Sequence, residues 1–320
     1  MNEPQRYRGA EPFRVFSLCL CVSAVYSTLC LRASVATASP LVHVGSLDVI
    51  HFKSRALGAE RIVRVWRPPH FSRRTRYAVF YLNDGQNLFG DGDPDSGGGW
   101  KIDETAARLL DQHAIEPLIV VGIDNGGDHA RGVDYLPVPD AFTDHPDPPG
   151  ADRYLSFVID ELIPFIDRKY PTRRGPPHTG FGGSSYGAAS ACYAALSRPG
   201  VFGRLLLESP SVGVGGGVML ERAQSLNVWP ERIVMGVGSG EGRGGRTSTD
   251  SGQADRGPTV FSTLVDILRS AGLGDDRLKV VVQQGARHNE EAWASRFPDA
   301  LAFLFRASGT GRETTRPPTR

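Results

Sequence analysis

Short apolar runs alternate with amphipathic segments along most of this 320-residue chain. The apolar runs are bounded by turn residues, which predicts eight strands, at residues 41–52, 61–67, 77–82, 118–123, 179–182, 205–208, 233–237 and 278–283. Apolar residues at three- and four-residue spacing predict helices between them, at residues 102–113, 152–169, 186–197, 259–270 and 289–305. Strands that alternate with helices indicate an α/β domain, so we expect a mostly parallel eight-stranded sheet flanked by helices at residues 41–306.

Three irregularities interrupt this pattern. Pro164 lies inside the helix predicted at 152–169 and should kink it or mark a tightening near its end, because proline has no backbone N–H. Two connectors are long, at residues 83–99 and 124–150, and loops of that length within a domain are often functional. We expect the second of them, together with residues 212–229, to cover a pocket.

The N-terminal segment differs from the rest of the chain. Arg6, Arg8 and Arg14 precede an apolar run at residues 15–31, which small residues follow up to Ser39. This order is typical of a secretory signal peptide, so we expect residues 1–38 to direct export and to be removed near Ala38. An uncleaved membrane anchor is the alternative; after cleavage we expect no stable membrane association.

Composition narrows the class of protein. The chain has 36 Lys and Arg against 35 Asp and Glu, and its basic residues are scattered, which argues against a nucleic-acid partner. Three of the four cysteines lie within residues 1–38, which leaves Cys192 alone, expected as a small buried helix residue. Residues 307–320 lack apolar periodicity and are expected to form a disordered tail. The sequence gives no indication of oligomeric state.

The most specific motif is Gly183-Ser184-Ser185-Tyr186-Gly187, which fits G-x-S-x-G. It stands between a predicted strand and a predicted helix. In that context the motif predicts a nucleophile elbow, a sharp turn that exposes Ser185 and needs small neighbours at Gly183 and Gly187.

A serine nucleophile needs a base and an orienting acid. Of eight histidines, His288 is the only one after the elbow, and it follows the last predicted strand. Glu241 is the first carboxylate after the strand at 233–237, in a glycine-rich loop that could aim it at an imidazole. Asp250 and Asp255 remain alternatives for the acid.

An oxyanion hole would complete the machinery. In α/β hydrolases it takes one amide from the residue after the nucleophile, here Tyr186, and one from the loop after the third strand. That loop contains Gly85 and Gln86, and Gly85 would permit the unusual backbone that points an amide inward.

The chain resembles the esterase family of α/β hydrolases that contains enterochelin (siderophore) esterases, feruloyl esterases, S-formylglutathione hydrolases and mycolyltransferases. The resemblance covers roughly residues 60–306 and rests on the elbow and on blocks at residues 79–89, 121–125, 131–137, 161–164, 208–211 and 288–290, with Trp293, Arg296 and Phe297. It implies that Ser185 is the nucleophile, His288 the base and Glu241 the acid, with the amides of Gln86 and Tyr186 as the oxyanion hole. Val212 and the glycines after it stand where many relatives carry tryptophans, which puts the substrate preference in doubt.

Three other motifs are weaker. Residues 240–245 fit a dinucleotide-binding G-x-G-x-x-G, but no helix opens after them. Asp91, Asp93 and Asp95 imitate half of a calcium loop, yet Ser96 and Ile102 occupy its glycine and bidentate-acid positions. The spacing of His129 and His145 matches no helical pair of metal ligands, so we expect no metal. We also expect no organic cofactor.

The sequence therefore predicts an exported serine esterase that hydrolyses a small-molecule or polysaccharide-linked ester through an acyl-enzyme. Two alternatives remain: an acyltransferase with the same triad, and a non-catalytic α/β-hydrolase scaffold.

Overall fold

A computed structural model describes residues 44–90, 92, 99–140, 147–241 and 257–307, all within the compact unit Leu41–Arg320. The predicted leader at 1–38 and all but one residue of the predicted tail lie outside the described residues. So do Asp91, Asp93, Asp95, His145, Asp250 and Asp255, and most of the stretch at 240–245. None of the helices in the described ranges is long and apolar enough to cross a membrane.

The eight predicted strands are confirmed, and each matches its expected range to within a few residues. They are β1 (Ser46–Ser54), β2 (Ala59–Arg67), β3 (Ala78–Asn83), β4 (Leu118–Ile123), β5 (Thr179–Ser184), β6 (Arg204–Glu208), β7 (Arg232–Gly238) and β8 (Leu278–Gln283). They form one sheet in the order β1-β2-β4-β3-β5-β6-β7-β8. The pairs β1–β2 and β2–β4 are antiparallel and the others parallel, so the predicted fold class is confirmed.

The predicted helices are also found. They correspond to α1 (Ile102–Asp111), α3 (Ala151–Ser156) with α4 (Ile163–Lys169), α5 (Tyr186–Ser197), α7 (Gly257–Ser270) and α8 (Glu290–Leu304). Two short helices were missed, α2 (Asp128–Tyr135) and α6 (Val218–Gln224), both within segments expected to be connectors. The short 3-10 turns are η1 (Gly85–Asn87), η4 (Pro176–His178) and η5 (Val214–Gly217).

The helix around Pro164 widens instead of tightening. Between α3 and α4 the chain passes through a π-helical segment, Phe157–Leu162, and Pro164 is the second residue of α4. The proline ring clashes with the carbonyl four residues before it, that of Asp160, which lies in this wider segment. Of the two responses expected at Pro164, a kink or a tightening, the tightening was therefore wrong.

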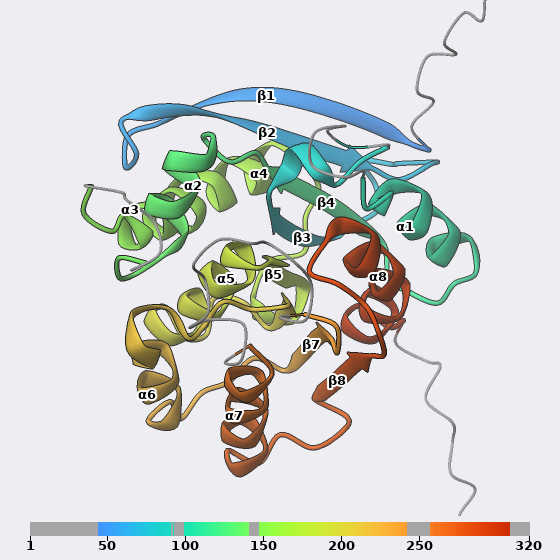
Figure 1. The fold of residues 1–320 in the computed structure, drawn as a ribbon. Helices are drawn as coiled ribbons and strands as arrows, with labels where there is room; N and C mark the ends of the chain where they lie inside the picture. The colour runs from blue at the N-terminus through green and yellow to red at the C-terminus, as the bar shows by residue number, and fades with distance from the viewer. Residues whose placement is uncertain (1–43, 91, 93–98, 141–146, 242–256, 308–320) are drawn as a thin grey trace, which may run out of the picture. The chain divides into compact units, whose positions relative to one another are not determined.

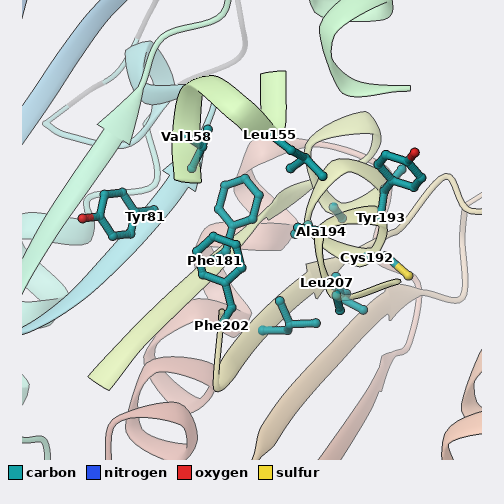
Figure 2. Packing of buried hydrophobic residues seen from close by; sticks show 14 of the residues in the cluster. Tyr81, Leu155, Val158, Phe181, Cys192, Tyr193, Ala194, Phe202 and Leu207 are labelled. Atoms are coloured by element: carbon teal, nitrogen blue, oxygen red, sulfur yellow. The ribbon is translucent and has the colours of Figure 1, made fainter. Parts of the chain in front are cut away.

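Alternate residues of the central strands face two separate cores. Val79 and Tyr81 belong to one cluster with Phe181 and helices α3, α5, α6 and α7, whereas Phe80 and Leu82 belong to another with α1 and α8. In the first cluster the rings of Phe181 and Phe202 stack at 4.9 Å (Figure 2). Helices α1 and α8 lie side by side on the other face (Figure 1). The sheet is thus covered by helices on both faces.

Cys192 is the small buried residue that the sequence predicted. It lies on α5 in the first cluster with 1% of its surface exposed. Burial raises the pKa of its thiol to about 12, so the thiolate is disfavoured at neutral pH.

Candidate active site

Ser185 sits at the turn between β5 and α5 with φ 55° and ψ −120°, a strained conformation for a residue other than glycine. Gly183 and Gly187 make the turn possible. A Cβ at Gly183 would lie 3.0 Å from the carbonyl carbon of Gly187, and one at Gly187 would lie 3.0 Å from the Cβ of Asn83. The structure thus forms the elbow expected from the motif, for the steric reason expected.

Asn83 supports the elbow from the end of β3. Its Nδ2 donates to the carbonyl of Gly187 at 2.8 Å, and its Oδ1 accepts from the hydroxyl of Tyr154 at 2.6 Å. Asn83 and Tyr154 are both buried. Sequence reasoning gave Asn83 no role, because nothing in its local pattern shows that it lies beneath a helix more than 100 residues later.

Glu241 and His288 are brought together from the ends of β7 and β8. Glu241 Oε2 lies 3.0 Å from His288 Nδ1, and Glu241 Oε1 accepts from the amide of Gly238 and the hydroxyl of Ser209, both at 2.7 Å. Burial alone would raise the pKa of Glu241, but these hydrogen bonds outweigh it and lower the pKa. An ionised Glu241 only accepts, so Nδ1 holds the imidazole proton and Nε2 is left as the basic nitrogen.

The loops that carry Glu241 and His288 also pack against each other. A Cβ at Gly238 would lie 2.1 Å from the carbonyl oxygen of Ala286, and the amide of Gly240 donates to that oxygen at 3.0 Å. The glycines therefore serve close backbone approach between the two loops, where the sequence had suggested only flexibility.

The hydroxyl of Ser185 points to another serine. Its Oγ lies 3.4 Å from Ser211 Oγ, and within the described residues no hydrogen bond joins Ser185 to His288. Catalytic hydrogen bonds are often long without substrate and shorten when it binds. The structure thus pairs two of the three expected side chains and places the third at the elbow after β5, with β6 between this strand and β7 in the sheet order.

In the loop expected to supply an oxyanion amide, the residue with a strained backbone is not the one that the sequence predicted. Asp84, with φ 58°, occupies the left-handed region, whereas Gly85 begins the turn η1 that contains Gln86. A Cβ at Gly85 would lie 2.6 Å from Asp124 Oδ1 and 2.7 Å from the carbonyl carbon of Gly122. Gly85 is thus required by packing, and the prediction that its own backbone would be unusual was wrong.

Arg131 fixes this loop. Its Nε and Nη2 donate to the two carboxylate oxygens of Asp84 at 2.8 and 2.9 Å, and Asn125 Nδ2 donates to Asp84 Oδ1 at 2.8 Å. The guanidinium also lies 5.5 Å from the ring centres of Tyr135 and Tyr186. Although burial would lower the pKa of Arg131, Asp84 raises it above its ordinary value. Arg131 therefore links the Asp84 loop to Tyr186, the residue after Ser185.

The side chain of Tyr186 extends toward the connector at 124–150. Its hydroxyl donates to the carboxylate of Asp140. Near the start of the same connector, the amide of Asn125 donates to Gln86 Oε1 at 3.3 Å. Both residues expected to supply oxyanion amides are thus held through their side chains.

A buried ion pair lies behind Ser185. Arg296 Nε donates to Glu208 Oε2 at 2.8 Å, and the carbonyl of Glu208 accepts from the amide of Ser185 at 2.9 Å. Burial raises the pKa of Glu208 to about 7, although Arg296 acts to lower it. Sequence reasoning gave neither residue a role; a charged residue at the end of a buried strand was the available signal.

His129 contacts a carboxylate. Its Nε2 lies 2.6 Å from Asp147 Oδ2. Within the described residues, no group of three or more His, Cys, Asp or Glu side chains could hold a metal ion.

Comparison with known proteins places this chain in a family. A family model described as "Putative esterase" matches residues 54–304. The chain is 26% identical to the uncharacterized protein YbbA of Bacillus subtilis (strain 168) over 256 residues, which is 78% of this chain and 93% of YbbA. The family match supports an ester hydrolase.

Two solved structures share the fold. The BES protein from Bacillus cereus has a TM-score of 0.65 at 17% identity, covering 84% of this chain and 99% of its own. The siderophore hydrolase EstB from Aspergillus nidulans has a TM-score of 0.62 at 20% identity, covering 84% of this chain and 98% of its own. At these identities the likeness is one of fold.

Proposed function

We propose, because the chain belongs to the Putative esterase family, that it hydrolyses a carboxylic ester through an acyl-enzyme formed on Ser185. The observation that supports this most is the contact of 3.0 Å between Glu241 and His288, made by residues 47 positions apart at the ends of neighbouring strands. A carboxylate that fixes an imidazole, together with a serine at a strained elbow, is the set of groups that acyl transfer needs.

In the first half-reaction, Ser185 Oγ attacks the ester carbonyl carbon while His288 Nε2 takes its proton. Glu241 holds the imidazole through Nδ1 and stabilises the imidazolium. The amides of Tyr186 and Gln86 donate to the oxyanion that develops on the carbonyl oxygen. Collapse of the tetrahedral intermediate breaks the bond to the alcohol, which leaves with the proton from His288.

In the second half-reaction, water attacks the acyl-enzyme. His288 takes a proton from the water as its oxygen bonds to the acyl carbon, and then returns a proton to Ser185 Oγ as the acid leaves. Apart from the ester and water, the proposed steps use only groups of the protein. Acyl transfer to another alcohol would differ only in this half-reaction, so both outcomes belong in the same test.

The activity test compares the purified protein with Ser185→Ala on short-chain p-nitrophenyl esters. The matched control is Ser190→Ala, since Ser190 is also on α5 but its buried hydroxyl has no hydrogen-bond partner among the described residues. We expect Ser185→Ala to lower kcat on the order of 10⁶-fold, and Ser190→Ala to leave it nearly unchanged. Equal turnover in wild type and Ser185→Ala would remove Ser185 from the mechanism, and no turnover in either would favour the scaffold alternative.

The natural substrate requires a panel of esters. EstB, which shares the fold, is described as a siderophore hydrolase, so siderophore esters head the panel, followed by feruloyl and acetyl polysaccharide esters and small thioesters. A competing alcohol in the assay separates hydrolysis from transfer. The substrate with the highest kcat/KM that depends on Ser185 identifies the class.

For the organisation of the chain, we propose an export leader at residues 1–38, an esterase domain at 41–306 and a tail at 307–320. The test is the N-terminal sequence of the protein recovered from outside the cytoplasm. A new N-terminus near Ser39 would support export with cleavage, whereas an intact Met1 on a membrane fraction would favour the anchor.

A further inference from the structure

The side chains of four residues form a closed ring of contacts, namely Ser209, Trp293, His288 and Glu241. Ser209 Oγ donates to Glu241 Oε1 at 2.7 Å and accepts from Trp293 Nε1 at 2.9 Å. The indole of Trp293 stands nearly perpendicular to the imidazole of His288, with ring centres 5.1 Å apart and an interplanar angle of 83°. The contact from His288 back to Glu241 closes the ring.

The direction of these hydrogen bonds is fixed by chemistry. The indole N–H of Trp293 can only donate, so the oxygen of Ser209 must accept from it. The hydroxyl proton of Ser209 is then directed to Glu241, and an ionised carboxylate only accepts. The pair therefore presents one fixed donor to the acid.

The backbone of Ser209 is strained where it makes this contact. Its φ is 46°, in the left-handed region, and its amide donates to the carbonyl of Gly236 at 2.7 Å. Glycine would adopt this φ more easily, so a serine here is retained at a cost in free energy. Ser209 and Trp293 are each only 5% exposed.

The partners that they contact are less buried. The side chain of His288 is 43% exposed, and that of Glu241 is 11% exposed. An imidazole on the surface would rotate among several orientations unless its neighbours restrict it. Trp293 can restrict it because the indole is itself packed against Trp100, with ring centres 6.1 Å apart.

We propose that Ser209 and Trp293 are positioning residues for the proposed esterase reaction: Ser209 orients the carboxylate of Glu241, and Trp293 orients both Ser209 and the ring of His288. This inference rests on the proposed function, since the residues act through its acid and base. Neither residue touches the reacting atoms. Their loss should therefore change kcat more than KM.

The kinetic test is a double-mutant cycle. Ser209→Ala removes the hydroxyl, and Trp293→Phe keeps an aromatic ring but removes the N–H donor. We expect each to lower kcat by up to about 100-fold with KM changed less than about threefold, because small displacements of a catalytic group have effects of that size. In a Glu241→Gln background, Ser209→Ala should lower kcat less than about twofold further, because Ser209 acts through Glu241.

A spectroscopic readout does not depend on turnover. The proton shared between His288 Nδ1 and Glu241 should give a downfield ¹H NMR signal in the wild-type protein, assigned by its loss in His288→Gln. We expect this signal to broaden or vanish in Ser209→Ala and Trp293→Phe and to persist in the control Ser190→Ala. Ser209→Gly serves as a second variant, because glycine tolerates the positive φ and removes the hydroxyl without backbone strain.

The outcomes separate this inference from the proposed function. An active wild type whose signal is unchanged in all Ser209 and Trp293 variants overturns the inference alone. Equal effects of Ser209→Ala with and without Glu241→Gln also overturn it. A signal that depends on Ser209 in a protein that hydrolyses no ester supports the positioning role and counts against the proposed reaction.

Discussion

The candidate active site has two sides that are held by different interactions. We call them the amide side, at the loop with Gln86, and the acid–base side, at Glu241 and His288. On the amide side, Asp84 and Arg131 form an ion pair whose side chains are 9% and 22% exposed, and this pair fixes the loop with Gln86. On the acid–base side, Glu241 and His288 are 11% and 43% exposed and are held by hydrogen bonds from Ser209 and Gly238. Stability and catalysis should therefore be coupled on the amide side and largely separable on the acid–base side.

Glu241→Gln tests the acid–base side and should have the largest effect among the changes that separate the two sides. We expect kcat to fall by about 10⁴-fold, because an amide in place of the carboxylate favours the wrong imidazole tautomer. The free energy of unfolding should fall by only about 1 kcal/mol, since hydrogen bonds at a partly exposed site contribute little. Enzyme kinetics and urea denaturation measure the two quantities.

The matched control for this change is Glu221→Gln on α6, whose side chain is exposed. It should leave both quantities unchanged. If Glu241→Gln lost stability in proportion to activity, the separation proposed for this side would be wrong.

Arg131→Met tests the amide side. It leaves the carboxylate of Asp84 in a buried position without its bidentate partner, which should cost about 3 kcal/mol of stability. Because the same loop supplies the amide of Gln86, we expect kcat to fall by about 100-fold in the folded variant. Arg153→Met, at an exposed position on α3, is the control for loss of an arginine. If Arg131→Met lost activity while its free energy of unfolding in urea stayed unchanged, stability and catalysis would not be coupled on the amide side, and the comparison would be wrong.

Glu208→Gln tests the ion pair that lies behind both sides, and its effect depends on pH. Burial raises the pKa of Glu208 from 4.5 to about 7, with Arg296 lowering and Glu241 raising it. A carboxyl with a raised pKa in the folded state stabilises the fold below about pH 4.5, and this contribution is lost as the pH rises through about 7.

The variant should therefore match the wild type in stability at pH 4.5. At pH 8 it should be more stable by up to ~3 kcal/mol, because the wild type then holds a buried charge. Urea denaturation of both proteins at the two pH values measures the difference between their free energies of unfolding. Titrating groups that the two proteins share cancel in this difference. A variant less stable than the wild type at pH 8 would mean that the ion pair with Arg296 outweighs burial.

Local pattern was sufficient for the strands, the long helices and the elbow. The runs at 118–123 and 278–283 matched β4 and β8 residue for residue, because each is a short apolar run bounded by turn residues. The short helices α2 and α6 were missed because few apolar residues repeat in seven or eight positions. The helix around Pro164 was expected to kink or to tighten, because the sequence shows the missing N–H but not how the neighbouring turns adjust.

The candidate site divides in the same way. Ser185 could be predicted because its constraints are local: Gly183 and Gly187 lie within two residues of it. The positions of Glu241 and His288 were expected from chain order, but their contact depends on Gly238 packing against Ala286. The roles of Asn83, Arg131 and Glu208 could not be inferred, because their partners lie between 47 and 104 residues away along the chain.

The amino-acid sequence by itself determined the α/β class, the strand and helix segments, the serine elbow and the chain order of the three candidate residues Ser185, Glu241 and His288. These features depend on periodicity and on steric limits within a few residues. Only the tertiary structure decided which charges are paired, which amide loop lies beside the elbow, and that Ser209 and Trp293 contact the acid and the base. Those features depend on side chains that meet after the parallel strands align, since their carboxyl ends then bring distant loops together at one edge of the sheet.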